Sequence, residues 1–465
     1  MSATDPIPVT EVPVSGLPLP DRRFAITAVL AAMSLVVLDA GMVNVAMPSI
    51  ADALAATPSE VVLVVTSYQT ALVMALLPCA ALGERFGNRR VFQIGICLFL
   101  LGSLLCAASA SLPWLIAARF LQGLGGAAVM ALGVALLRFT VADDRLATAV
   151  GWNAFTVALS SAAAPTLGAL VLAQTEWRWL FLLGLPATLI ALFASRFLPL
   201  AKPTAQALDF SSMALNAAGF GLMVLAAEAL HHAPLTALGV GAGAVLAFVF
   251  LLHRESKKIA PLFPLDLLRE RPFRLSVIAS VCCFTGQSAA LIALPFYLQH
   301  GLGLSPLMVG FYLSSWPIAV AVTSGVAGRL SNRLSSSHLC AIGAALLALG
   351  LAAMALWPLA ETPFSLLGFA ALCGVGFGLF QVPNNRNMFL NAPAHRSGAA
   401  GGIQGTARLT GQLSGAVLMT ALFVLTPLVA APRLGLALGA GFALASGVVS
   451  LFRFSTREGA SHAAP

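Results

Sequence analysis

Two ionisable residues lie far inside long apolar stretches of the sequence. Asp39 stands about two-thirds along the apolar run 24–47, and Arg119, the other charge within the spans of the first half, lies near the outer end of the run 113–137. A carboxylate in hydrocarbon is costly, and such residues are usually functional. Low polarity favours its protonated form, whereas a nearby cation favours the carboxylate. A carboxyl balanced between these effects could take up and release a proton, although a permanent pair between two helices would use the same residue.

The composition requires a lipid environment around these residues. Of 465 residues, 59% are hydrophobic and only 9% are charged, whereas soluble domains carry about 25% charged residues. The net charge of +8 lies in short clusters between apolar runs, which is typical of cytoplasmic loops and does not indicate nucleic-acid binding. The sequence has no phosphate-binding loop, no metal-ligand cluster and no nucleophile with a base. We therefore expect no enzyme activity and no cofactor, and a proton gradient as the energy source.

The apolar runs are long enough to cross a membrane, which takes about 20 residues as a helix. The predicted spans are 24–47, 61–82, 91–110, 113–137, 147–172, 177–198, 210–229, 234–252, 275–298, 305–327, 337–358, 364–383, 401–428 and 433–452. We predict an all-α membrane protein with fourteen transmembrane helices.

Basic residues indicate the orientation of these spans. With the N-terminus inside, 21 Lys and Arg residues fall in cytoplasmic segments and two, Arg178 and Arg433, fall outside. Basic residues concentrate in cytoplasmic loops, so we expect a multi-pass protein of the bacterial inner membrane with both termini cytoplasmic. Residues 1–22 lack the pattern of a signal peptide and are predicted to be a disordered cytoplasmic tail, with a second tail at 454–465.

Two weak similarities relate the ends of the chain. Residues 80–87 align with 328–335 at an offset of 248, and residues 119–125 align with 370–376 at an offset of 251. They indicate a duplicated six-helix unit. Six-helix halves of this kind rock around a midplane site in many secondary transporters.

The offset leaves room for two additional helices between the copies. We predict an N-terminal six-helix bundle at 23–198, two inserted helices and a linker at 199–270, and a C-terminal six-helix bundle at 271–453.

Several motifs resemble the major facilitator superfamily, and within it the fourteen-helix drug:proton antiporter-2 family. LDAGMVNVAMP at 38–48 resembles the first-helix signature, and LGERFGNRR at 82–90 resembles the loop between the second and third helices. RFLQG at 119–123 matches the fourth-helix signature. APTLGA at 164–169 resembles the antiporter signature of the fifth helix, with Pro165 and Gly168 as strict matches.

The resemblance implies a major facilitator fold that exports amphipathic, often cationic drugs in exchange for protons by alternating access. Its implied partners are a small-molecule substrate, protons and the lipid bilayer, and it implies a monomer. It assigns Asp39 and Arg119 to proton coupling. A gating loop that locks the outward-open state would contain Glu84, Arg85, Gly87 and Arg89, and a hinge would contain Pro165 and Gly168.

Polar residues inside the spans are candidates for the lining of a substrate cavity, although some of them could simply join helices. Gln404, Arg408 and Gln412 share one helical face. The candidates are Asn44, Gln69, Asn153, Gln287, Tyr297, Gln381, Asn384, Arg408 and Gln412.

Two other functions stay open on the sequence. One is a carrier specific for one small metabolite, for example a vitamin. A single acid in the core spans and the departures from the antiport signature leave room for neutral or anionic cargo, with Arg119 or Arg408 as its partner. The other is a membrane sensor that does not transport, against which the intact Asp39, Arg119 and inner loop argue.

Overall fold

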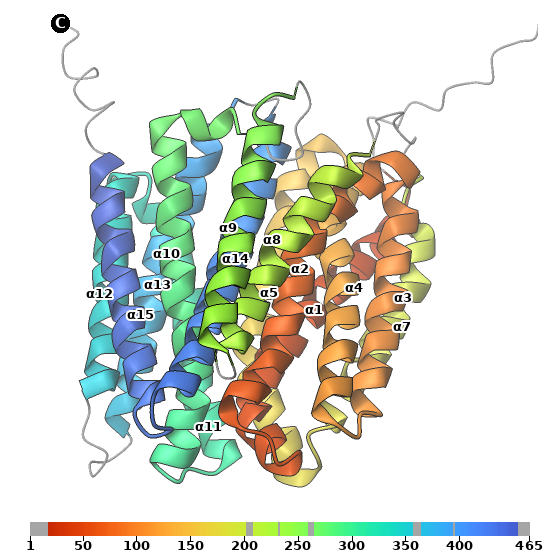
Figure 1. Cartoon of the computed structure of the whole chain (residues 1–465). Helices are drawn as coiled ribbons and strands as arrows, with labels where there is room; N and C mark the ends of the chain where they lie inside the picture. Colours follow the sequence, from red (N-terminus) through yellow and green to blue (C-terminus); the bar gives the residue numbers. More distant parts are fainter. Residues whose placement is uncertain are drawn as a thin grey trace, which may run out of the picture.

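The computed structural model describes residues 17–200, 208–230, 233–258, 265–356, 364–393 and 396–453. Fourteen of its helical segments are long and apolar enough to cross a membrane. They run side by side as one bundle (Figure 1). The predicted all-α fold with fourteen spans is therefore confirmed.

The first six spans form a group that we call the N-terminal group. It consists of α1 (Asp21–Ala53), α2 (Pro58–Phe86), α3 (Asn88–Ala107), α4 (Leu112–Thr140), α5 (Asp143–Gln174), α6 (Trp179–Leu183), α7 (Leu185–Ala194) and the short 3-10 turn η1 (Ser195–Phe197). α4 packs between α2 and α3, and α1 packs against α5, α7 and α4. α6, α7 and η1 together make the sixth span.

Local sequence signals set the ends of these helices. Thr57 caps α2: its hydroxyl accepts from the backbone N–H of Glu60, and the Glu60 carboxylate accepts from the N–H of Thr57. Two unsatisfied N–H groups of the first turn are bonded in this way. In the sixth span, Pro186 lacks the N–H that would bond the carbonyl of Leu182, and the helix is interrupted at Gly184.

Two inserted helices follow, α8 (Phe210–Ala229) and α9 (Pro234–Glu255). They pack against each other, and α8 also contacts α2 and α14 (Figure 1). The amide of Asn216 in α8 donates a 2.9 Å hydrogen bond to the carbonyl of Met74 in α2. A buried amide bonded across two helices fixes the inserted pair to the bundle.

The last six spans form the C-terminal group. It consists of η2 (Leu267–Arg269), α10 (Arg271–Phe296), the π-helical turn η3 (Tyr297–Gly301), α11 (Pro306–Leu330), α12 (Ser336–Leu356), α13 (Phe364–Leu390), α14 (Ser397–Leu425) and α15 (Ala431–Leu451). α13 packs between α11 and α12, and α10 packs against α14 and α15.

The two groups repeat one glycine contact at the offsets seen in the sequence. A Cβ on Gly125 of α4 would lie 2.4 Å from the backbone nitrogen of Phe99 in α3. A Cβ on Gly376 of α13 would lie 2.4 Å from the backbone nitrogen of Leu347 in α12. Phe99 and Leu347 are 248 positions apart, and the glycines are 251 apart. Both contacts need a residue without a side chain because two backbones touch.

A second contact of the same kind follows the same offsets. A Cβ on Gly123 of α4 would lie 2.5 Å from the carbonyl oxygen of Tyr68 in α2. A Cβ on Gly374 of α13 would lie 2.2 Å from the carbonyl oxygen of Trp316 in α11. The arrangement of three helices around α4 is thus repeated around α13, as expected for a duplicated unit.

The two groups meet closely where α5 ends and α11 begins. A Cβ on Gly310 of α11 would lie 2.2 Å from the Cβ of Ala169 and 2.7 Å from the carbonyl oxygen of Pro165, both in α5. The hydroxyls of Thr166 and Ser314 are 2.5 Å apart across the same contact. This end of the bundle is therefore closed between α5 and α11.

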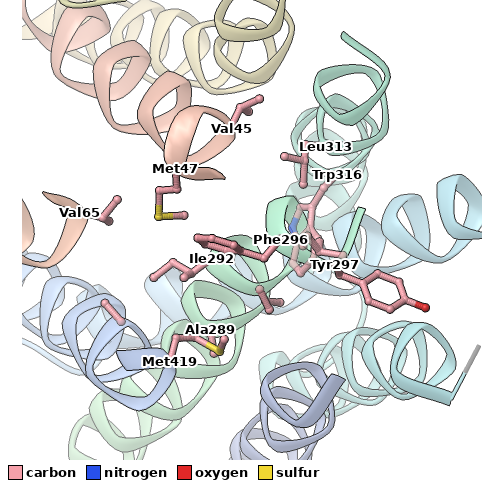
Figure 2. Packing of buried hydrophobic residues seen from close by; sticks show 14 of the residues in the cluster. Val45, Met47, Val65, Ala289, Ile292, Phe296, Tyr297, Leu313, Trp316 and Met419 are labelled. Carbon is pink, nitrogen blue, oxygen red and sulfur yellow. The ribbon is translucent and has the colours of Figure 1, made fainter. Parts of the chain in front are cut away.

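A buried apolar cluster joins the groups in the same region. Figure 2 shows Met47 of α1 and Val65 of α2 facing Ile292 and Phe296 of α10, with Met419 of α14 nearby. All five side chains are almost fully buried.

The two ends of the described chain lie at the same end of the bundle (Figure 1). Residues 1–16 of the predicted first tail, and all of the second, lie outside the described residues. At residues 17–22 the structure differs from the predicted tail: α1 begins at Asp21, and the N–H of Leu17 donates to the carbonyl of Thr140. Most helices extend beyond the predicted spans because hydrogen bonding continues after the apolar run has ended.

Replacing Gly125 with alanine should destabilise the protein. Its Cβ would collide with the backbone of α3, and overpacking of this kind costs about 1–3 kcal/mol. We expect a lower midpoint of thermal unfolding in detergent. Gly151→Ala is the matched control because a Cβ there meets nothing within 4 Å, and equal midpoints for the two variants would contradict the contact.

Candidate functional site

Asp39 and Arg119 meet inside the N-terminal group. Nη1 of Arg119 in α4 lies 2.5 Å from Oδ2 of Asp39 in α1. Both side chains are almost completely buried, at 1% and 5% exposed. In the described part of the chain, Asp39 is the one carboxylate more than three residues from the end of a spanning helix. The two residues predicted to couple protons are thus one ion pair.

Gln122 completes this pair. Its amide nitrogen donates to Oδ1 of Asp39 at 2.9 Å and to the hydroxyl of Ser103 in α3 at 2.8 Å. Its carbonyl oxygen accepts from Nη1 of Arg119 at 2.5 Å. Gln122 therefore bonds both members of the pair and holds α1, α3 and α4 together.

Neutral groups surround the rest of the arginine. Nε of Arg119 donates to the carbonyl of Val64 in α2 at 3.3 Å. The guanidinium carbon lies 4.2 Å from the ring centre of Tyr68 and 5.7 Å from that of Phe181. Cation–π contacts of this kind stabilise a desolvated guanidinium. Within the described part of the chain, Asp39 is the single negative charge that neutralises Arg119.

The sequence reasoning singled out neither Gln122 nor Tyr68. Gln122 is the glutamine of the RFLQG motif, three residues after Arg119. That spacing puts both side chains on one face of α4, and this signal could have identified it. Tyr68 offers no comparable signal, because its contact with Arg119 depends on how α2 packs against α4.

The predicted gating loop is a one-residue connection. α2 ends at Phe86 and α3 begins at Asn88, so Gly87 alone joins them, with φ 97° and ψ 124°. Only glycine adopts such a backbone readily. Glu84 and Arg85 are exposed at the end of α2.

Arg89, the fourth predicted gating residue, bonds within the N-terminal group. Its Nη1 donates to the carbonyl of Leu198 at 3.0 Å, which ties the start of α3 to the end of the sixth span. A role of this loop in closing one face between the groups stays a prediction.

The predicted hinge residues lie where α5 touches two helices. The carbonyl of Pro165 faces Gly310 of α11, and a Cβ on Gly168 would lie 3.1 Å from the backbone of Met42 in α1. α5 therefore packs closely on both groups at this point.

Two of the predicted cavity residues have partners inside the C-terminal group. Asn384 donates to the carbonyl of Ser276 at 3.2 Å and accepts from Arg453 at 2.7 Å. Tyr297 is buried, and Figure 2 shows its hydroxyl pointing away from α1 and α2. It contacts Arg433 of α15. In this structure both residues join helices of one group.

The other predicted cavity residues form no side-chain hydrogen bond within the described residues. Their side chains are wholly or partly buried. In three of them a buried side-chain oxygen has no donor: Asn44, Gln69 and Asn153. The remaining four are Gln287, Gln381, Arg408 and Gln412. Buried polar groups without partners are rare and require an explanation, which a ligand between the groups would supply.

No group of three or more His, Cys, Asp or Glu side chains in the described ranges is placed to hold a metal ion.

Comparison with known proteins places this architecture in a family. The family model described as Major Facilitator Superfamily matches residues 29–416. The chain is 42% identical over 414 residues to "Uncharacterized transporter YebQ" of Escherichia coli K12, covering 88% of this chain and 91% of the relative. It is 28% identical to "Riboflavin transporter RibZ" of Clostridioides difficile, covering 80% and 81%. It is 30% identical to the "Tetracenomycin C resistance and export protein" of Streptomyces glaucescens, covering 89% and 78%. The predicted family is confirmed, and this chain is a membrane transporter that belongs to the Major Facilitator Superfamily.

Proposed function

We propose that this transporter exports amphipathic small molecules in exchange for protons, with Asp39 as the group that binds the proton. The observation that carries the proposal is the buried pair of Asp39 and Arg119. Similarity to an export protein supports the direction of transport.

The surroundings of the pair explain why a proton would change the structure. When Asp39 takes up a proton, Arg119 loses its one negative partner and keeps only the neutral contacts of Val64, Gln122 and the aromatic rings. Removing one partner of a buried ion pair typically costs about 3–5 kcal/mol. The protonated state therefore favours a rearrangement of α1 relative to α4.

α1 is placed to transmit such a rearrangement to the contact between the groups. Gly41, two residues after Asp39, packs against Ala164 of α5. A Cβ on Gly41 would lie 2.5 Å from the Cβ of Ala164. Further along α1, the carbonyl of Val45 accepts from the Gln299 amide of η3 at 3.3 Å. A shift of α1 would thus disturb its contacts with α5 and with the C-terminal group.

A carrier for one metabolite is the second candidate. Arg408 has no negative partner among the described residues, which suits a defined polar cargo better than a broad set of cations. The similarity to a protein named as a riboflavin transporter points the same way. In this case Asp39 would still couple the proton, and the substrate would differ.

Asp39→Asn should abolish proton exchange. Inside-out vesicles are acidified by respiration, and a fluorescent pH probe is followed while amphipathic drugs and single metabolites, including riboflavin, are added. Compounds that the protein carries should dissipate the gradient with the native protein and should not do so with Asp39→Asn, because the asparagine cannot bind the proton.

Asp52→Asn is the matched control, since Asp52 lies on the same helix with 76% of its side chain exposed, and it should behave like the native protein. If the carried compounds dissipate the gradient with Asp39→Asn as they do with the native protein, the proposal is contradicted. A response to one metabolite and to none of the drugs would favour the second candidate.

A disulfide between α5 and α11 should stop transport. In a variant whose seven native cysteines are replaced, Thr166→Cys and Ser314→Cys would place two thiols where the hydroxyls are 2.5 Å apart. Alternating access requires this contact to open, so oxidation should block transport and a reductant should restore it.

The control is a disulfide within the C-terminal group. Gly447→Cys and Ala344→Cys would join α15 to α12, where the Ala344 Cβ lies 3.1 Å from a Cβ built on Gly447. This bond should leave transport intact. Full transport with the α5–α11 disulfide formed would show that the two helices do not separate.

A further inference from the structure

Arg408 is a cation near the middle of a transmembrane helix. It lies eleven residues after the start of α14 and seventeen before its end. At a rise of 1.5 Å per residue, it is about 16 Å from one end and about 25 Å from the other. A lysine or arginine at a helix end can extend its side chain to the headgroups, whereas this depth is costly for a charge without a partner.

The described structure supplies no counter-ion for this arginine. Arg408 takes part in no hydrogen bond or ion pair within the described ranges, and its buried Nε has no acceptor. Arg119 is also buried inside a spanning helix but has Asp39, Gln122 and a backbone carbonyl as acceptors. The contrast indicates that the partner of Arg408 is a bound molecule and not another residue of the protein.

The contacts of α14 show that Arg408 faces the space between the two groups. On one side of it, Gly411 packs on α10: a Cβ on Gly411 would lie 2.6 Å from the carbonyl oxygen of Val281. On its other side, Gly405 packs on Leu76 of α2 at 3.4 Å. Arg408 falls between these two faces of the helix. It therefore points between α10 of the C-terminal group and α2 of the N-terminal group.

Amide side chains lie at the same depth on α2. Gln69 lies seven residues before Leu76 in α2, and Gln412 lies seven residues after Gly405 in α14. Seven residues are about two helical turns, so each glutamine is on nearly the same face of its helix as the residue at the contact. Because α2 and α14 run in opposite directions, these two glutamines lie level with each other, one turn from Arg408. The Gln69 Oε1 is buried without a donor.

Amide side chains also approach from α13. The Gln404 amide donates to Oδ1 of Asn385 at 3.4 Å, which fixes the register of α13 against α14. Gln381 is four residues before Asn385 in α13, and Arg408 is four residues after Gln404 in α14. Because the two helices are antiparallel, Gln381 and Arg408 lie at the same level. Its side chain is half-buried and has no partner among the described residues.

From this geometry we infer that Arg408, with Gln69, Gln381 and Gln412, forms a subsite that binds the carboxylate of an amphipathic substrate. The inference rests on the proposed transport function and names the class of its cargo. A guanidinium binds a carboxylate through two parallel hydrogen bonds, and the amide nitrogens can donate to the remaining lone pairs.

The charges favour an acid over a cationic drug. The one deep carboxylate of the described chain, Asp39, is already bonded to Arg119 and Gln122. Among the described residues, the one deep cation without a partner is Arg408, and it faces the interface. This positive charge would repel a cationic substrate, whereas a carboxylate would neutralise it and offset the cost of its desolvation.

The test is a binding measurement with matched probes. Purified protein in lipid nanodiscs is titrated with naphthalene, pyrene and steroid compounds, each as the carboxylate, the primary amide and the amine, with empty nanodiscs to correct for partition. We expect the native protein to bind at least one carboxylate at least tenfold more tightly than its amide and amine. Arg408→Gln should remove this preference, and Arg408→Lys should retain part of it.

Arg396→Gln removes a charge from the first end of the same helix, where Arg396 pairs with Asp266, and should change nothing. Absence of any carboxylate preference in the native protein, or its persistence in Arg408→Gln, would overturn the inference. Tighter binding of matched phosphonates than of carboxylates would overturn the choice of carboxylate. The assay uses no proton gradient, so failure of proton coupling in Asp39→Asn vesicles is a separate result.

Discussion

The burial of Arg119 is the constraint on which the N-terminal group depends. A guanidinium that is 1% exposed inside a membrane bundle needs a negative charge, and Asp39 is the one that reaches it. Gln122 then bonds both residues, so that α1, α3 and α4 meet at one polar point. Because protonation of Asp39 would leave the arginine with neutral partners alone, the same contact that fixes these helices can release them. Helix packing and the proposed proton binding therefore depend on the same interaction.

The two copies of the duplicated unit differ at the position of this buried pair. The two groups share their backbone contacts, since Gly125 and Gly376 each allow α4 and α13 to touch the neighbouring helix. At the polar point they differ: Ala370 stands at the position of Arg119, and Cys373 at that of Gln122. Cys373 directs its thiol to the carbonyl of Leu347, and Ala370 is buried. The fold thus needs the glycines in both copies, whereas the charged pair is not required for packing and is present where the proposed coupling needs it.

Much of the fold follows from the sequence because hydrocarbon imposes a simple rule on length and polarity. The fourteen apolar runs, the repeat offsets and the family motifs predicted the helices and their order. The pairing of Asp39 with Arg119 was only an open alternative, because no pattern gives the distance between two helices 80 positions apart. Asn384 and Tyr297 were expected in a cavity but contact Arg453 and Arg433 within one group. Residue type marks a side chain as polar, and helix packing decides which neighbour it meets.

The two deep arginines differ in a way that separates coupling from recognition. Arg119 is neutralised by the protein itself, so a substrate gains little by approaching it. Arg408 has no negative partner among the described residues, and the burial of its Nε without an acceptor carries a cost until an anion binds. Binding an acid would remove this cost, and opening the interface to water would lower it as well. If the subsite binds as proposed, closing both faces around an empty site would bury this charge without a partner, and a bound carboxylate would offset that cost.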